Sequence, residues 1–221
     1  DDVNIDKVAD IAIAAKFRNN GQVCISPNRF YVQENVKNEF VNAFIDRAKK
    51  LKIGNGMDEG VNLGPLTTAK RLEEIERLVD KTKKEGAEVL LGGKRPSGFN
   101  KGFFYEPTVF DHVKDDFTIM KEEPFGPLVP MLSFKSFDEV MERANDNDLG
   151  LCSYLYTNSM DKANRGSELL ETGCVAVNTG AVAIAEAPFG GIKQTGYGRE
   201  GGSMAIKDYL NVKYTHMALE I

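Results

Sequence analysis

The chain has 221 residues, a formal net charge of −5 and 42% hydrophobic residues. This length and composition allow one large α/β domain, or two small ones, with a sizeable core. The acidic balance, with no cluster of Lys and Arg, argues against a nucleic-acid surface, because phosphate binding needs a concentrated cationic face. No apolar run approaches the length of a membrane span, and the acidic first residues do not fit a signal peptide. These features predict a protein of a reducing, cytoplasmic compartment.

The cysteines differ in their sequence surroundings. Cys24, Cys152 and Cys174 are odd in number and widely spaced, which predicts neither a disulfide framework nor a C-x-x-C metal site. With only two histidines in the chain, a metal cluster would lack ligands. Cys152 and Cys174 lie in apolar runs and are expected in the core. Cys24 follows the turn at Gly21, at a break between elements where a side chain can meet substrate, so it is the candidate nucleophile. The alternative for Cys24 is a small buried hydrophobe, the common fate of a free cysteine.

The predicted elements alternate between helices and strands. Apolar residues at helical spacing predict a first helix over 5–17, which delivers the chain to Gly21 and Cys24. The further predicted elements are a strand over 30–33, a helix over 35–51, a helix capped by Thr67 or Thr68 with a buried stripe to Val79, strands over 87–91, 102–110 and 128–134, a helix over 137–145, a strand over 151–156, a helix over 160–171 and a strand over 173–178. This rhythm predicts an open α/β sheet with flanking helices.

The last part of the chain departs from this rhythm. A glycine-rich loop over 187–202 is followed by a short predicted helix and by the β-like run 209–214. A strand at a chain end with alternating side chains can pair with another subunit. We therefore expect a main domain over 1–208 and an oligomerisation strand within 209–221.

Three separated motifs carry a family resemblance. They are residues 17–24 (Phe-Arg-Asn-Asn-Gly-Gln-Val-Cys), residues 122–127 (Glu-Glu-Pro-Phe-Gly-Pro) and the loop from Pro188-Phe189-Gly190-Gly191 to Gly198-Arg199-Glu200. In order and spacing they resemble the aldehyde dehydrogenase superfamily, over essentially the whole chain. The chain most resembles succinate-semialdehyde dehydrogenases, because Arg18 stands six residues before Cys24, where those enzymes place an arginine for the substrate carboxylate.

Two positions depart from the pattern of those enzymes. The second cysteine that some of them carry two residues after the nucleophile is Ser26 here. The serine that helps to hold the carboxylate in some members falls in 181–185, a segment that contains none. A redox switch through Ser26 is therefore not expected, and the exact semialdehyde stays open.

The resemblance implies a fold, a reaction and a set of site residues. The fold is the catalytic domain of the superfamily, without the N-terminal cofactor domain that carries the general-base glutamate and the oxyanion-hole asparagine. Cys24 is implied to attack an aldehyde, with NAD or NADP accepting the hydride, in a homo-oligomer joined through the C-terminal strand. Glu123 is implied to bind the hydroxyls of the nicotinamide ribose, with Phe125 beside the nicotinamide ring. Phe189 is implied to line the substrate entrance.

Each of these residues also has a plainer interpretation. Glu123 could only solvate a rigid turn, Arg18 could be a helix residue paired with a nearby acid, and Phe189 could be an ordinary core side chain. For the whole chain, the alternative is a catalytically inactive assembly or interaction module of the same fold.

Overall fold

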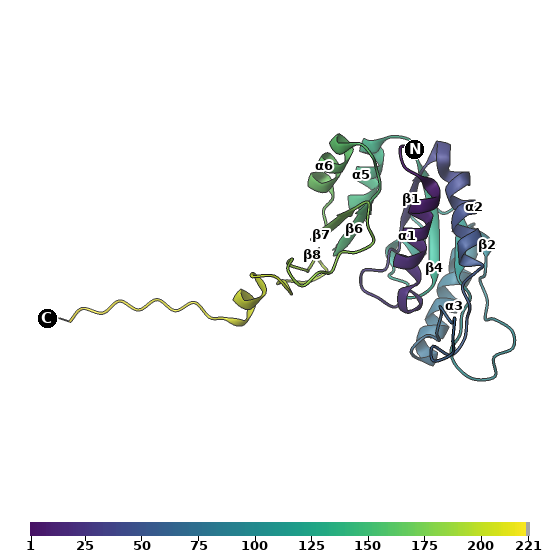
Figure 1. The fold of residues 1–221 in the computed structure, drawn as a ribbon, viewed down its shortest axis with the longest axis horizontal. Helices are drawn as coiled ribbons and strands as arrows, with labels where there is room; N and C mark the ends of the chain where they lie inside the picture. The colour runs from purple at the N-terminus through teal and green to yellow at the C-terminus, as the bar shows by residue number, and fades with distance from the viewer. Residues whose placement is uncertain (220–221) are drawn as a thin grey trace.

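Four strands form the central sheet of the structure, a computed structural model that describes residues 1–219 (Figure 1). Their order is β2 (Glu88–Leu91), β3 (Thr108–Asp111), β4 (Leu128–Phe134) and β1 (Phe30–Gln33). Strands β3, β4 and β1 run parallel, and β2 is antiparallel to β3. The predicted open α/β sheet is confirmed, and the bounds of β1 and β4 are those expected from the sequence.

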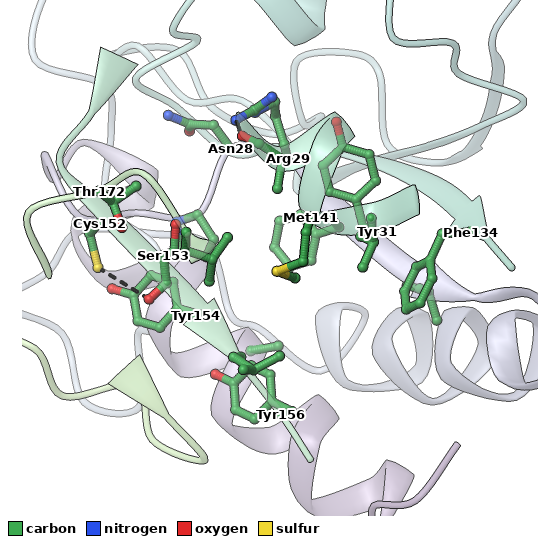
Figure 2. Close-up of a pocket in the computed structure, with 18 of the residues that line it drawn as sticks. Asn28, Arg29, Tyr31, Phe134, Met141, Cys152, Ser153, Tyr154, Tyr156 and Thr172 are labelled. Atoms are coloured by element: carbon green, nitrogen blue, oxygen red, sulfur yellow. Dashed lines mark hydrogen bonds between the residues drawn. The ribbon is translucent and has the colours of Figure 1, made fainter. Parts of the chain in front are cut away.

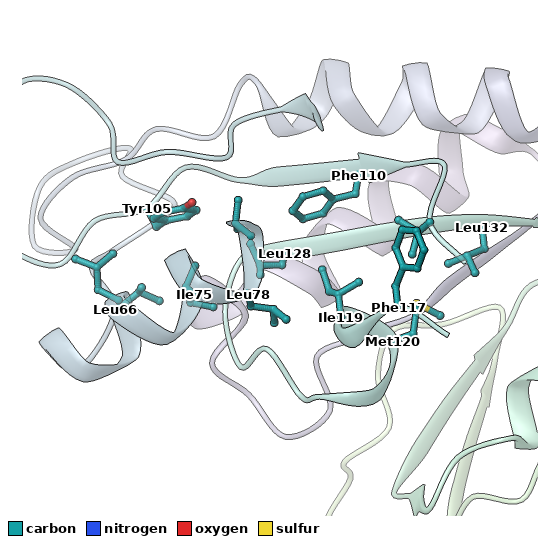
Figure 3. Close-up of a cluster of buried hydrophobic side chains, with 13 residues drawn as sticks. Leu66, Ile75, Leu78, Tyr105, Phe110, Phe117, Ile119, Met120, Leu128 and Leu132 are labelled. Atoms are coloured by element: carbon teal, nitrogen blue, oxygen red, sulfur yellow. The ribbon is translucent and has the colours of Figure 1, made fainter. Parts of the chain in front are cut away.

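Helices cover both faces of this sheet. Their bounds are α1 (Ile5–Phe17), α2 (Lys37–Ala48), α3 (Ala69–Lys84), α4 (Thr118–Lys121), α5 (Phe137–Asn145) and α6 (Met160–Leu169), with 3-10 turns η1 (Arg18–Gly21), η2 (Glu34–Val36) and η3 (Ala205–Tyr209). Val109 and Val129 point into a core with α1 and α2, while Phe110 and Leu128 point into a second core with α3 (Figure 3). This alternation is the period-2 pattern of strands that are buried on both faces.

Polar side chains at the helix starts explain where the helices begin. Asn4, Thr68, Ser136 and Ser159 each accept a backbone N–H from the first turn of α1, α3, α5 and α6, respectively. Such caps satisfy backbone donors that have no partner within the helix. Of the two threonines predicted to cap α3, Thr68 is therefore the one that does so.

A smaller unit lies beside the central sheet (Figure 1). Its parallel strands β6 (Cys152–Leu155) and β7 (Cys174–Val177) accompany α5 and α6, and the short strands β5 (Leu149–Gly150) and β8 (Ile192–Lys193) pair antiparallel. Cys152 and Cys174 are direct neighbours across β6 and β7. Both cysteines were predicted to lie in the core, and the structure leaves both only half-buried.

The strand predicted over 102–110 is shorter than expected. It begins at Thr108, and before it Phe103 makes only an isolated bridge to Leu66. Pro107 has no backbone N–H to donate to a ladder, which explains why pairing starts after it. The predicted helix over 35–51 likewise ends early, at Ala48.

The C-terminal segment extends away from the rest of the chain (Figure 1). Tyr209 ends η3, and residues 210–218 form no ladder with any part of the chain that the structure describes. Leu210, Val212 and Tyr214 are exposed. Pairing of this segment with another subunit stays a prediction, and residues 220 and 221 of the predicted segment 209–221 lie outside the described residues. Within residues 1–219, no helix combines the length and apolar character that a membrane crossing requires.

Candidate active site

Cys24 lies on a loop that leaves the end of α1 through η1. Within this loop Asn19, Asn20 and Gly21 have φ angles of 48°, 57° and 75°. These angles lie in the left-handed region, which glycine adopts freely and asparagine tolerates better than most residues. The Asn-Asn-Gly sequence therefore fits the reversal that carries the chain from α1 to Cys24.

Two contacts hold this reversal against neighbouring loops. The Gln22 side-chain oxygen accepts a hydrogen bond from the Thr67 backbone N–H at 2.9 Å, just before α3. A Cβ atom placed on Gly21 would lie 2.2 Å from the carbonyl oxygen of Gly126, so only a glycine permits this approach. The first motif is thus packed directly on the loop of residues 122–127, which carries the second motif.

The segment after the nucleophile is fixed by two further hydrogen bonds. The Ser26 hydroxyl donates to the backbone carbonyl of Lys16 at 3.0 Å, and the Tyr154 hydroxyl donates to the carbonyl of Ile25 at 2.8 Å. Cys24 itself is exposed. The Cys24 thiol is therefore exposed on a loop that hydrogen bonds from Ser26 and Tyr154 hold in place. The alternative interpretation of Cys24 as a small buried hydrophobe is wrong.

A cavity of about 640 Å³ opens beside this loop, between β1 and β6. In Figure 2 Tyr31 and Met141 lie on one side of it, and Cys152, Ser153 and Tyr154 lie on the other. Cys24 and Glu123, predicted from two separate motifs, both line it. The structure thus brings the candidate nucleophile and the candidate cofactor carboxylate to one cavity.

The other three predicted site residues lie outside the lining of that cavity. Arg18 is exposed, and its guanidinium makes no salt bridge with an acid of residues 1–219, so the pairing offered as its plainer interpretation is not found in the described chain. Phe125 has a φ of 44°, uncommon for a bulky side chain, and its ring lies 5.7 Å from the Arg71 guanidinium carbon. Phe189 is half-buried and exchanges two 2.7 Å backbone hydrogen bonds with Glu200. The functional roles of these three residues stay predictions.

Burial raises the pKa values of two side chains that line the cavity, Cys152 and Tyr154. It raises the pKa of the Cys152 thiol to about 12, so this second thiol of the cavity stays protonated and unreactive at neutral pH. It also raises the pKa of Tyr154, which therefore remains a neutral hydroxyl donor to Ile25. Of the two cysteines that line the cavity, Cys24 is the exposed one.

Sequence reasoning missed two residues at this site, Lys16 and Tyr154. Lys16 is completely buried, and burial lowers the pKa of its amine to about 7 against the opposing effect of the Glu123 carboxylate. The sequence did indicate that Lys16 is buried, because Ala9, Ala12 and Lys16 follow the spacing i, i+3, i+7 of one helix face. Tyr154 gave no such signal, because β6 brings it to Ile25 from more than a hundred residues away.

A helix-flanked α/β sheet with an exposed cysteine on a firmly held loop beside a cavity is the arrangement expected of enzymes that use a thiol nucleophile. Comparison with known proteins then gives the family. The pattern of the aldehyde dehydrogenase family matches residues 1–215, and the chain belongs to this family.

Individual relatives agree with this assignment. The mitochondrial succinate-semialdehyde dehydrogenase of Oryza sativa is 42% identical over 218 residues, covering 98% of this chain and 41% of that protein. Glutarate-semialdehyde dehydrogenase of Pseudomonas putida is 44% identical over 214 residues, covering 97% of this chain and 44% of that protein. Among solved structures, the NAD⁺ complex of an aldehyde dehydrogenase from Bacillus cereus superposes with a TM-score of 0.95 at 37% identity, over 100% of this chain and 44% of that one. The chain thus spans less than half the length of these relatives.

Proposed function

We propose that this chain supplies the nucleophile-bearing half of an NAD(P)-dependent aldehyde dehydrogenase that oxidises a carboxylated semialdehyde to the acid. The observation that carries the proposal is the exposed Cys24 on the rim of the cavity that Glu123 also lines. Membership of the aldehyde dehydrogenase family supports the reaction class. The relatives named for succinate and glutarate semialdehyde support the substrate class.

The chemistry proposed for this chain is centred on the Cys24 sulfur. As a thiolate, Cys24 adds to the aldehyde carbon and forms a C–S bond, which gives a thiohemiacetal whose oxyanion the Cys24 backbone N–H can stabilise. Loss of hydride from that carbon leaves a thioester on Cys24, and water then cleaves the C–S bond to release the carboxylic acid. The family resemblance implies that the general base for the last step and the asparagine of the oxyanion hole belong to the cofactor domain.

The residues present fit a nicotinamide cofactor. The Glu123 carboxylate is exposed and makes no salt bridge within residues 1–219, so its oxygens are available to accept hydrogen bonds from ribose hydroxyls. The neighbouring Glu122, by contrast, is paired with Arg77. Phe125, two residues on, would lie beside the cofactor ring. NAD or NADP, when bound, supplies the hydride acceptor. Relatives are named with either cofactor, so the choice between the two stays open.

Arg18 is the residue proposed to select a carboxylated substrate. It is exposed, and its guanidinium has no acidic partner in residues 1–219, so it can bind a carboxylate through two parallel N–H donors. Phe189 is proposed to line the approach to the thiol.

The function can be tested with a chimera. The 221 residues replace the matching segment of the succinate-semialdehyde dehydrogenase of Escherichia coli, which is 41% identical over 219 residues. Formation of NADH or NADPH with succinic semialdehyde is then measured for the chimera, for its Cys24→Ser variant and for the 221-residue chain alone. Activity in the chimera that is lost in Cys24→Ser supports the proposal. A folded chimera that forms no reduced cofactor with any aldehyde would favour the inactive assembly module instead.

The substrate class has its own test. In the chimera, Arg18→Ala is expected to raise KM for succinic semialdehyde by about tenfold or more and to leave KM for the neutral butanal unchanged, because a charge-assisted pair is lost. Arg165→Ala, on the exposed face of α6, is the matched control. Equal effects of Arg18→Ala on both aldehydes would refute the carboxylate clamp.

We also propose homo-oligomer formation through the C-terminal segment and a cytoplasmic location. The exposed apolar residues Leu210, Val212 and Tyr214, at alternate positions of an extended segment, support pairing with another copy. The three free cysteines are consistent with a reducing compartment. Light scattering of the chain with and without residues 210–221 tests the assembly, which requires a smaller particle after the deletion.

A further inference from the structure

Lys16 is a charged side chain in a position where a helix normally places an apolar one. Its side chain is completely buried, in the same row of α1 as Ala9 and Ala12. Burying an amine in apolar surroundings is unfavourable unless polar groups compensate. The contacts of Lys16 therefore show what this residue does in the fold.

Both ends of Lys16 are tied to the loop that carries the nucleophile. Its backbone carbonyl accepts the hydrogen bond from the Ser26 hydroxyl at 3.0 Å, and its Nζ donates to the Asn28 side-chain oxygen at 3.3 Å. Ser26 and Asn28 stand two and four residues after Cys24. A single residue of α1 thus anchors the segment after the thiol at two points.

The position of Lys16 relative to the cavity of Cys24 follows from its partners. The Glu123 carboxylate raises the pKa of the Lys16 amine, in opposition to burial. Ser26 and Asn28, the other polar groups at Lys16, are neutral. Asn28 and Glu123 both line the cavity of Cys24. Lys16 therefore supports, through Asn28, a residue that lines the same cavity as Cys24.

We propose that Lys16 is a positioning residue, whose buried Nζ fixes the loop of residues 22–28 through Asn28. Only the catalytic role of Cys24 rests on the proposed function. The positioning itself is a property of the loop and can be measured without any aldehyde or cofactor.

The first measurement is hydrogen exchange of the loop amides in the 221-residue chain. Lys16→Met, which keeps the length but removes the donor, is expected to speed exchange of residues 22–28 by about tenfold, the effect of losing one charge-assisted hydrogen bond. Asn28→Ala should do the same, and the double variant should be no faster than either single variant. Lys16→Gln, which keeps an N–H donor, should restore most of the protection. Lys7→Met, at an exposed lysine of the same helix, is the control.

The second measurement is catalytic and uses the chimera. Lys16→Met is expected to lower kcat about tenfold while KM for the aldehyde stays within twofold, because the thiol is misplaced but the substrate contacts remain. Unchanged exchange of the loop in a folded Lys16→Met chain, or additive effects in the double variant, would overturn the proposal. If Lys16→Met does not fold, Asn28→Ala alone tests the proposal. Unchanged hydrogen exchange of residues 22–28 in Asn28→Ala would then refute the role of the Lys16–Asn28 hydrogen bond. If the loop results hold and the chimera has no activity, the proposed function fails and the positioning stands.

Discussion

Replacement of Lys16 by methionine should make the stability of this chain less dependent on pH. Burial lowers the pKa of the Lys16 amine from 10.5 to about 7. Each unit of difference between the folded and unfolded pKa values corresponds to about 1.4 kcal/mol. The buried ammonium therefore destabilises the fold by about 5 kcal/mol at a pH where the amine is protonated in both the folded and the unfolded chain. Lys16→Met removes this destabilisation, and it also leaves the Asn28 oxygen without its donor, which costs about 1–3 kcal/mol.

The direction of the pH effect follows from the two pKa values. Between about pH 7 and pH 10.5 the unfolded chain holds a proton on Lys16 that the folded chain has released, so stability rises with pH in this window. The destabilisation is complete below about pH 6 and falls to about 1–2 kcal/mol at pH 9.5. The wild type should therefore gain about 3 kcal/mol relative to Lys16→Met between pH 6 and pH 9.5.

Urea unfolding, followed by circular dichroism at both pH values, measures this difference. The variant should be the more stable protein at pH 6 by about 2–4 kcal/mol and should lose that advantage at pH 9.5. Lys7→Met controls for the loss of a lysine from α1. A constant difference between wild type and Lys16→Met at the two pH values would show that Lys16 does not titrate in the neutral range, and the reasoning from burial would be wrong.

Three further substitutions test the loop and its supports. Gly21→Ala should destabilise the chain by about 2–4 kcal/mol, because the new Cβ would lie 2.2 Å from the Gly126 carbonyl oxygen and φ is +75°. Urea unfolding measures this loss. A urea midpoint equal to that of the wild type would mean that the loop moves to accept the Cβ. Tyr154→Phe should cost about 1 kcal/mol by removing the donor to the Ile25 carbonyl. A thermal melt measures the loss, and exchange of the neighbouring Ser26 amide, which donates to the Val23 carbonyl, should become faster. Unaltered exchange at Ser26 would contradict this expectation. Thr68→Ala should cost about 1 kcal/mol through the lost cap of α3, whereas Thr67→Ala should be nearly neutral; the two melting temperatures compare the sites directly, and equal losses would show that the cap is misassigned.

The elements that sequence predicted well are those whose pattern is local. The run Leu128–Phe134 is continuous and apolar, as expected for a strand buried on both faces, and its bounds as β4 are those predicted. Helix α5 was equally clear, because Ser136 caps it and the apolar spacing ends at Asn145. The start of β3 at Thr108 was missed although Pro107 marks it, because the apolar and aromatic run from Phe103 to Tyr105 is also typical of a strand.

The candidate site was predictable where a motif carries the residue. Cys24 and Glu123 come from two separate motifs, and the structure brings both to one cavity. The supports of the site could not be found in this way, because they are made across the sequence. Asn28 is reached by Lys16 from the end of α1, and Ile25 is reached by Tyr154 from β6. Periodicity could have marked Lys16 as buried, but only its contacts show which loop it holds.

The strand order of the central sheet also constrains how the chain can fold. Strand β1 precedes its partner β4 in the chain, and Phe30 pairs with Met131 about 100 residues further along. Because closing so long a loop is slow, β1 and the loop of residues 22–28 before it stay unpaired until β4 has been synthesised. A nascent chain that ends before Phe134 would leave the edge of β1 without its partner strand, so docking of β4 is the step that covers this apolar edge.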